Sequence, residues 1–81
     1  MSERIHVVED EPLVRDLVVL NLEHEGYTVT SSGTFPEGLR ALTSEPPTLA
    51  IVDVMLPGGD GFTLTRSVRD RGLTCPILML T

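Results

Sequence analysis

Carboxylate and hydroxyl residues stand at the ends of three short apolar runs. Glu9 and Asp10 close the first run, Asp53 closes a later one, and Thr81 follows the last. Two of these runs, 49–52 and 77–80, are continuously apolar, which is typical of strands that are covered on both faces of a parallel sheet. In such sheets the functional crevice lies beyond the carboxyl ends of the strands. We therefore expect the three carboxylates to converge on one pocket.

Several carboxylates in one crevice need a cation to offset their charge. Hard oxygen ligands with room for water favour Mg²⁺, which usually takes one or two carboxylates and leaves positions open for a phosphate. One of the carboxylates can then be a nucleophile that forms an aspartyl phosphate, while the ion neutralises charge on the transferring group. The pattern thus predicts a metal-assisted phosphoryl site.

The elements that position these residues alternate between strand and helix. Helix starts and stops are indicated by Pro12, by the T-x-x-E capping box of Thr34 and Glu37, and by Gly26 and Gly72. The expected order is a strand at 5–8, a helix at 13–22, a strand around 27–29, a helix from 34, a strand at 49–52, a loop at 53–61, a helix at about 62–71 and a strand at 77–80. This β-α-β-α-β-α-β order predicts an α/β fold, a doubly wound parallel sheet with right-handed crossovers.

Other residues receive structural interpretations. The apolar stripe of the first helix, which includes Leu13, Leu17 and Leu20, is expected to be ordinary core. Asp60 is expected to cap the third helix. His6 and His24 lack metal-ligand spacing, so we expect both to be structural.

Composition excludes several classes of protein. The 81 residues allow one domain at most, and a domain this small has a limited core. The formal net charge is -6, and all six basic residues are Arg, which argues against direct nucleic-acid binding by this segment. A single cysteine, Cys75, cannot form an intrachain disulfide, and no long apolar span predicts a membrane segment. We expect a cytoplasmic protein.

Three segments, VVEDEPLVR, IVDVMLPGGDGF and PILMLT, resemble signature segments of the receiver domains of two-component response regulators. The resemblance runs through the whole chain and implies a flavodoxin-like receiver fold. It implies that Asp53 is the phosphoacceptor and that Asp10 is a direct ligand of Mg²⁺, with Glu9 a water-mediated one. The backbone carbonyl of Met55 would be a further ligand, and Thr81 would bond the phosphoryl group and act in the switch.

The family's pattern continues through a fourth helix, a fifth strand with an essential Lys, and a fifth helix. The sequence contains no Lys. We therefore expect residues 1–81 to be the N-terminal portion of a receiver domain with impaired phosphorylation chemistry. The strand at 77–80 would be an exposed apolar edge, which favours a homodimer or a domain-swapped dimer.

The leading functional hypothesis is a signalling switch that takes a phosphoryl group from a sensor histidine kinase onto Asp53. Such a protein is a substrate more than an enzyme, and control of transcription is a family-level expectation. A phosphohydrolase would place a second acid where Met55 stands, and an EF-hand loop would need oxygen ligands at Val54, Met55 and Pro57. A non-phosphorylated interaction or dimerisation module with a receiver-like fold is an open alternative.

Overall fold

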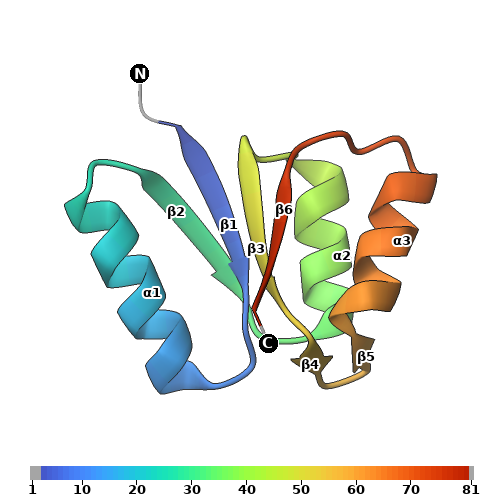
Figure 1. The fold of residues 1–81 in the computed structure, drawn as a ribbon, viewed down its shortest axis with the longest axis horizontal. Coiled ribbons are helices and arrows are strands. Elements are labelled where there is room, and N and C mark those ends of the chain that lie inside the picture. Colours follow the sequence, from blue (N-terminus) through green and yellow to red (C-terminus); the bar gives the residue numbers. More distant parts are fainter. Residues whose placement is uncertain (1–2, 81) are drawn as a thin grey trace.

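A four-stranded parallel sheet forms the centre of the computed structural model, which describes residues 3–80 (Figure 1). Its order is β2-β1-β3-β6, so β1 and β3 are neighbours. The strands are β1 (Arg4–Val8), β2 (Thr28–Ser32), β3 (Leu49–Asp53) and β6 (Ile77–Leu80). The register pairs Val8 with Val52, which places Glu9 and Asp53 at the same edge of the sheet. The predicted doubly wound α/β fold is confirmed.

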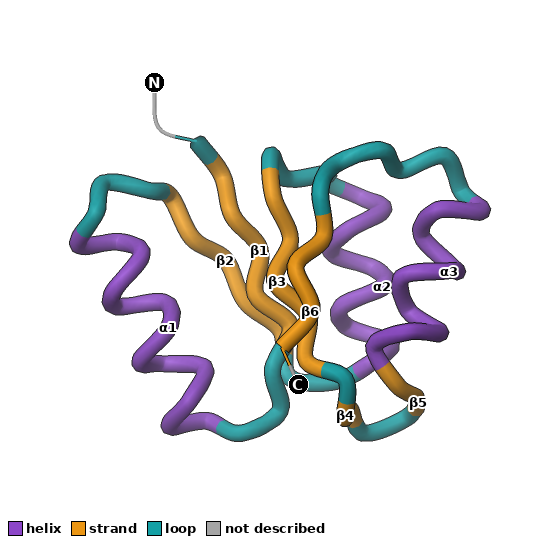
Figure 2. The backbone as a smooth tube through the Cα atoms, viewed as in Figure 1, coloured by secondary structure: helices purple, strands orange, loops and turns teal. Residues whose placement is uncertain are grey.

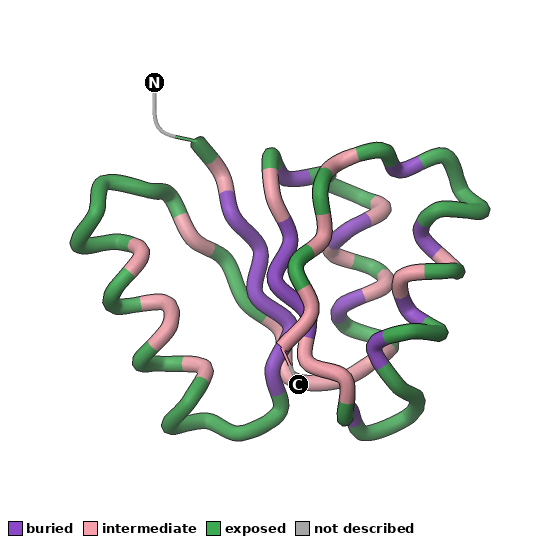
Figure 3. The backbone as a smooth tube through the Cα atoms, viewed as in Figure 1, coloured by how far each residue is buried: buried purple, intermediate pink, exposed green. Residues whose placement is uncertain are grey.

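Helices cover both faces of the sheet, as Figures 1 and 2 show. The helices are α1 (Pro12–His24), α2 (Phe35–Ser44) and α3 (Gly61–Asp70). On the face of α2 and α3, Leu42, Leu64 and Val68 pack with Val8 and Val52, and all five are fully buried. On the other face, α1 packs Val18, Val19 and Leu22 against a cluster formed by Ile5, Val7 and Ile51. The burial is deepest along β1 and β3 (Figure 3).

The predicted helix caps are present. The Glu37 amide donates to Thr34 Oγ1 over 3.3 Å, and the Glu37 carboxylate accepts from the Gly33 amide over 3.3 Å. At the start of α3, Asp60 Oδ1 accepts from the Thr63 amide over 2.8 Å. These side chains satisfy amides that have no partner within the helix, and they fix where α2 and α3 begin.

The prediction for the leucine stripe of α1 is wrong. Leu13, Leu17 and Leu20 are 79%, 60% and 64% exposed, and no residue of α1 is fully buried. The sequence of α1 is apolar on more than one side, and the sheet can cover only the side that carries Val18 and Leu22. In the part of the chain that the structure describes, the leucine stripe of α1 is therefore exposed and does not pack against the sheet.

The segment expected to be a loop contains two short strands. β4 (Met55–Leu56) and β5 (Gly59–Asp60) pair antiparallel, which leaves Pro57 and Gly58 as a two-residue turn. Gly58 has a φ of +89°, a conformation that favours glycine. The hairpin leads directly from Asp53 to α3.

None of the helices in residues 3–80 has the length and apolar character that crossing a bilayer requires.

Candidate metal and phosphoacceptor site

Three carboxylates meet at the carboxyl ends of β1 and β3. One oxygen from each of Glu9, Asp10 and Asp53 lies within 4.8 Å of the others. The adjacent strands bring them together, because β1 ends immediately before Glu9 and β3 ends on Asp53. The expected convergence is thus observed, while the roles of these residues as ligands and acceptor stay predictions.

Glu9 is the buried member of the cluster, with 5% of its surface exposed. Its Oε1 accepts from the Glu11 amide over 3.3 Å, and its backbone carbonyl accepts from Arg15 Nη1 over 3.0 Å. Burial raises the pKa of the Glu9 carboxyl, and a hydrogen bond with Asp53 and the charges of Asp53 and Asp10 raise it further. The pocket therefore favours either a proton or a cation beside Glu9.

Asp53, at the end of β3, is half-buried beside Glu9 and Asp10. Its Oδ1 accepts from the Met55 amide over 3.3 Å, which orients the carboxylate. The next residue, Val54, makes two backbone hydrogen bonds. The Val54 amide donates to the Leu80 carbonyl over 3.1 Å, and the Val54 carbonyl accepts from the Gly61 amide over 2.7 Å. The backbone after Asp53 is thus fixed to β6 and to the start of α3.

Gly61 has a positional role that sequence reasoning missed. A Cβ atom at this position would lie 2.3 Å from the Asp53 carbonyl oxygen and 2.9 Å from Met79 Cε. Contacts this short are excluded, so only glycine lets α3 begin this close to the acceptor strand. The Asp60-Gly61 pair in the sequence was a signal for the helix start but gave no hint of this contact.

The remaining predicted site residues have different outcomes. Met55 lies in β4 with its side chain 74% exposed, and its role as a ligand through the backbone carbonyl stays a prediction. Thr81 lies outside the described residues. Asp60 serves as the cap of α3, and the hydrogen bond that its carboxylate accepts from the Thr63 amide lowers the pKa of the carboxyl.

The chemistry of the donor set fits Mg²⁺. All three side chains offer hard oxygen atoms, and Asp10 is exposed, which leaves space for water and for a phosphoryl oxygen. The strand order and the helix layers define a doubly wound α/β domain. The three carboxylates at the β1–β3 edge give this domain a candidate cation site.

Comparison with known proteins places this domain in a family. Residues 5–81 match the profile of the response regulator receiver domain. Regulatory protein VanR of Enterococcus faecium is 44% identical over 81 residues, and the match covers 100% of this chain and 35% of VanR. The alkaline phosphatase synthesis transcriptional regulatory protein PhoP of Bacillus subtilis is 41% identical over 81 residues, with 34% of its length covered. The chain spans about a third of the length of these curated relatives.

Solved structures agree with this match. The response regulator protein TrrA from Thermotoga maritima, in complex with Mg²⁺-BeF, superposes with a TM-score of 0.92 at 33% identity, over 98% of this chain and 69% of TrrA. The N-terminal domain of a response regulator receiver protein from Methanoculleus marisnigri JR1 gives 0.91 at 34% identity, over 98% and 66%. The chain belongs to the response regulator receiver domain family.

Proposed function

We propose that this domain accepts a phosphoryl group on Asp53 from a phosphohistidine of a sensor histidine kinase. The observation that carries the proposal is the convergence of Glu9, Asp10 and Asp53 at the β1–β3 edge of a receiver fold. An Asp53 oxygen attacks phosphorus, a P–O bond forms, and the P–N bond to the kinase histidine breaks. The Met55 amide holds Oδ1 and so fixes the direction of the carboxylate.

In this proposal Asp10, Asp53 and the Met55 carbonyl hold Mg²⁺, with Glu9 acting through water. The bound ion would neutralise charge on the transferring phosphoryl group. Glu9 is suited to a supporting role because it is buried and its backbone carbonyl is held by Arg15. The magnesium complex of TrrA supports this assignment, since that relative has the same fold.

The domain would act as a switch and as a substrate of its kinase. Phosphorylation would change a contact to Thr81 and so control an output, and the relatives described as transcriptional regulators support an output in transcription. The family and the acidic composition support a cytoplasmic phosphorelay protein that does not bind nucleic acid through this segment.

A second candidate is an interaction or dimerisation module that does not depend on phosphorylation. One observation favours it. The leucine stripe of α1 and the edge strand β6, where Leu78 is 54% exposed, present apolar surface that a second copy could cover, either directly or by domain swapping.

The test is the intact mass of the protein after incubation with Mg²⁺ and acetyl phosphate. We expect one phosphoryl adduct and its loss in Asp53→Asn. Asp60→Asn is the matched control, because Asp60 is an exposed helix cap, and it should keep the adduct. An adduct that persists in Asp53→Asn, or the absence of an adduct in every variant, would refute Asp53 as the acceptor. The interaction module would then be the remaining candidate.

A further inference from the structure

A polar groove with a volume of about 630 Å³ lies between the edge of the sheet and α2. We call it the β2–α2 groove. Its lining includes Arg4, His6, Arg15, Thr30, Ser32 and Arg40. The three carboxylates of the phosphoacceptor site are not among the lining residues, so the groove is a separate feature.

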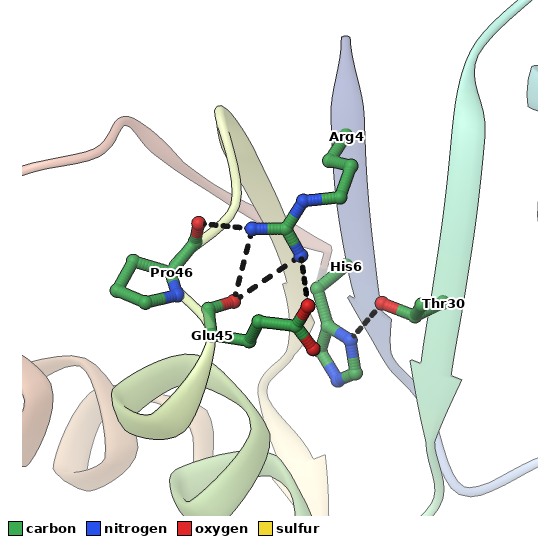
Figure 4. A network of polar contacts seen from close by, with 5 residues as sticks. All are labelled: Arg4, His6, Thr30, Glu45 and Pro46. Atoms are coloured by element: carbon green, nitrogen blue, oxygen red, sulfur yellow. Dashed lines mark hydrogen bonds and ion pairs between the residues drawn. The ribbon is translucent and has the colours of Figure 1, made fainter. Parts of the chain in front are cut away.

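The floor of the groove is a hydrogen-bonded trio. His6 is 4% exposed, its Nδ1 lies 2.6 Å from Thr30 Oγ1, and its Nε2 lies 2.8 Å from Ser32 Oγ. Figure 4 shows the His6 ring directed at Thr30. Burial, with a smaller effect from the charge of Arg4, lowers the pKa of His6 to about 4, so the ring is neutral at pH 7.

A neutral imidazole has one donor and one acceptor nitrogen. One of the two hydroxyls therefore donates to the ring, and the other accepts from it and keeps its own proton. That hydroxyl is an available hydrogen-bond donor at the floor of the groove.

Positive charge is concentrated around this floor. Three of the six arginines of the chain line the groove, against two of its twelve acidic residues, Glu37 and Glu45. The charged lining residues therefore sum to +1, whereas the chain as a whole has a net charge of -6. Oxyanions are the ligands that such a wall favours.

Two of the arginines are held in place. Arg4 reaches the end of α2, where it donates to the carbonyl oxygens of Glu45 and Pro46 and lies 4.0 Å from the Glu45 carboxylate (Figure 4). Arg15 donates to the Glu9 carbonyl. The side chain of Arg40, on α2, is exposed and has no hydrogen bond or ion pair to any residue in 3–80, so its guanidinium is available to a ligand.

We propose that the β2–α2 groove binds a small organic anion through a phosphate or carboxylate group. The Arg40 guanidinium on α2 and the hydroxyl of the His6 trio at the floor supply donors, and Arg4 and Arg15 supply positive charge. The volume lies within the range of small-molecule sites, about 300–1,000 Å³.

The test is a titration of ¹⁵N-labelled protein followed by amide chemical shifts. The background is Asp53→Asn with EDTA present, which removes the phosphoacceptor and any divalent cation. Inorganic phosphate and succinate are added in separate arms, so the stronger ligand tells phosphate chemistry from carboxylate chemistry. We expect saturable shifts at the amides of Ser32, Gly33 and Ala41, which line the groove.

Matched variants locate the binding. Arg40→Gln should raise the dissociation constant of the tighter-binding anion by about tenfold, because the substitution removes a charge-assisted hydrogen bond. Arg66→Gln removes an exposed arginine from α3 and should change the affinity by less than about twofold. Thr30→Val, which removes one hydroxyl of the trio, should also weaken binding.

Three results would overturn the proposal. The shifts with both anions could fail to saturate, they could be confined to residues around Asp53, or Arg66→Gln could weaken binding as much as Arg40→Gln does. The background lacks the acceptor, so each result is independent of whether Asp53 is phosphorylated in the natural protein.

Discussion

His6 should make the stability of the protein depend on pH. Burial and the nearby charge of Arg4 lower the pKa of its ring from 6.5 to about 4 in the folded state. In the unfolded chain the ring is solvated and takes up a proton near pH 6.5. Below that pH the unfolded state binds a proton that the folded state does not. The contribution of His6 is therefore fully present above pH 6.5 and is lost as the pH falls toward 4.

The magnitude follows from the size of the shift. Each pH unit between the two pKa values costs about 1.4 kcal/mol, so the total loss is about 3 kcal/mol at pH 4. That is a large share of the stability of a small domain, which is typically about 5 kcal/mol or somewhat more.

Urea denaturation of the wild type and of His6→Gln between pH 7.5 and pH 4 measures this effect. Glutamine cannot take up the proton, and its amide can still contact a hydroxyl of the trio. The carboxylates titrate in both proteins, so the difference between the two pH curves isolates His6. We expect this difference to change by about 3 kcal/mol across the range. Parallel curves, or a folded-state His6 ring that titrates near pH 6.5 by NMR, would refute the reasoning.

Four further substitutions test packing and positioning. Gly61→Ala would place a Cβ 2.3 Å from the Asp53 carbonyl oxygen, so we expect weaker Mg²⁺ binding and a loss of about 1–3 kcal/mol in the free energy of unfolding. Leu17→Ala, on the exposed stripe of α1, should change the free energy of unfolding by less than about 0.5 kcal/mol, whereas the buried Leu64→Ala should cost about 2–5 kcal/mol in the same urea assay. Equal losses for the two leucines would mean that the stripe is packed in solution. Thr34→Ala removes the cap of α2 and should cost about 1 kcal/mol; no change would show that the cap is not needed.

Local rules explain why much of the fold could be predicted. The apolar run in β3 is continuous because this inner strand of the parallel sheet is covered on both faces. The starts of α2 and α3 were readable because Thr34 and Asp60 bond amides only three residues away. The convergence of the acidic residues followed from one topological rule about the edge of such sheets.

Features that depend on through-space contacts could not be predicted. The α1 helix carries more apolar surface than the sheet can cover, and only the packing shows that Leu17 faces outward. The His6 trio depends on the register that pairs His6 with Thr30 across two strands. The contact of Gly61 with the Asp53 carbonyl joins two elements whose separation the sequence does not specify.

A Mg²⁺ titration of labelled protein followed by NMR tests whether the three carboxylates form a metal site. We expect saturable shifts at the amides of Glu9, Asp10 and Asp53 and at the carbonyl carbon of Met55, and their loss in Asp10→Asn. Glu11→Gln removes one negative charge from the adjacent exposed residue and should leave Mg²⁺ binding intact. Shifts spread over the acidic surface, or equal losses in the two variants, would contradict a built metal site at the acceptor.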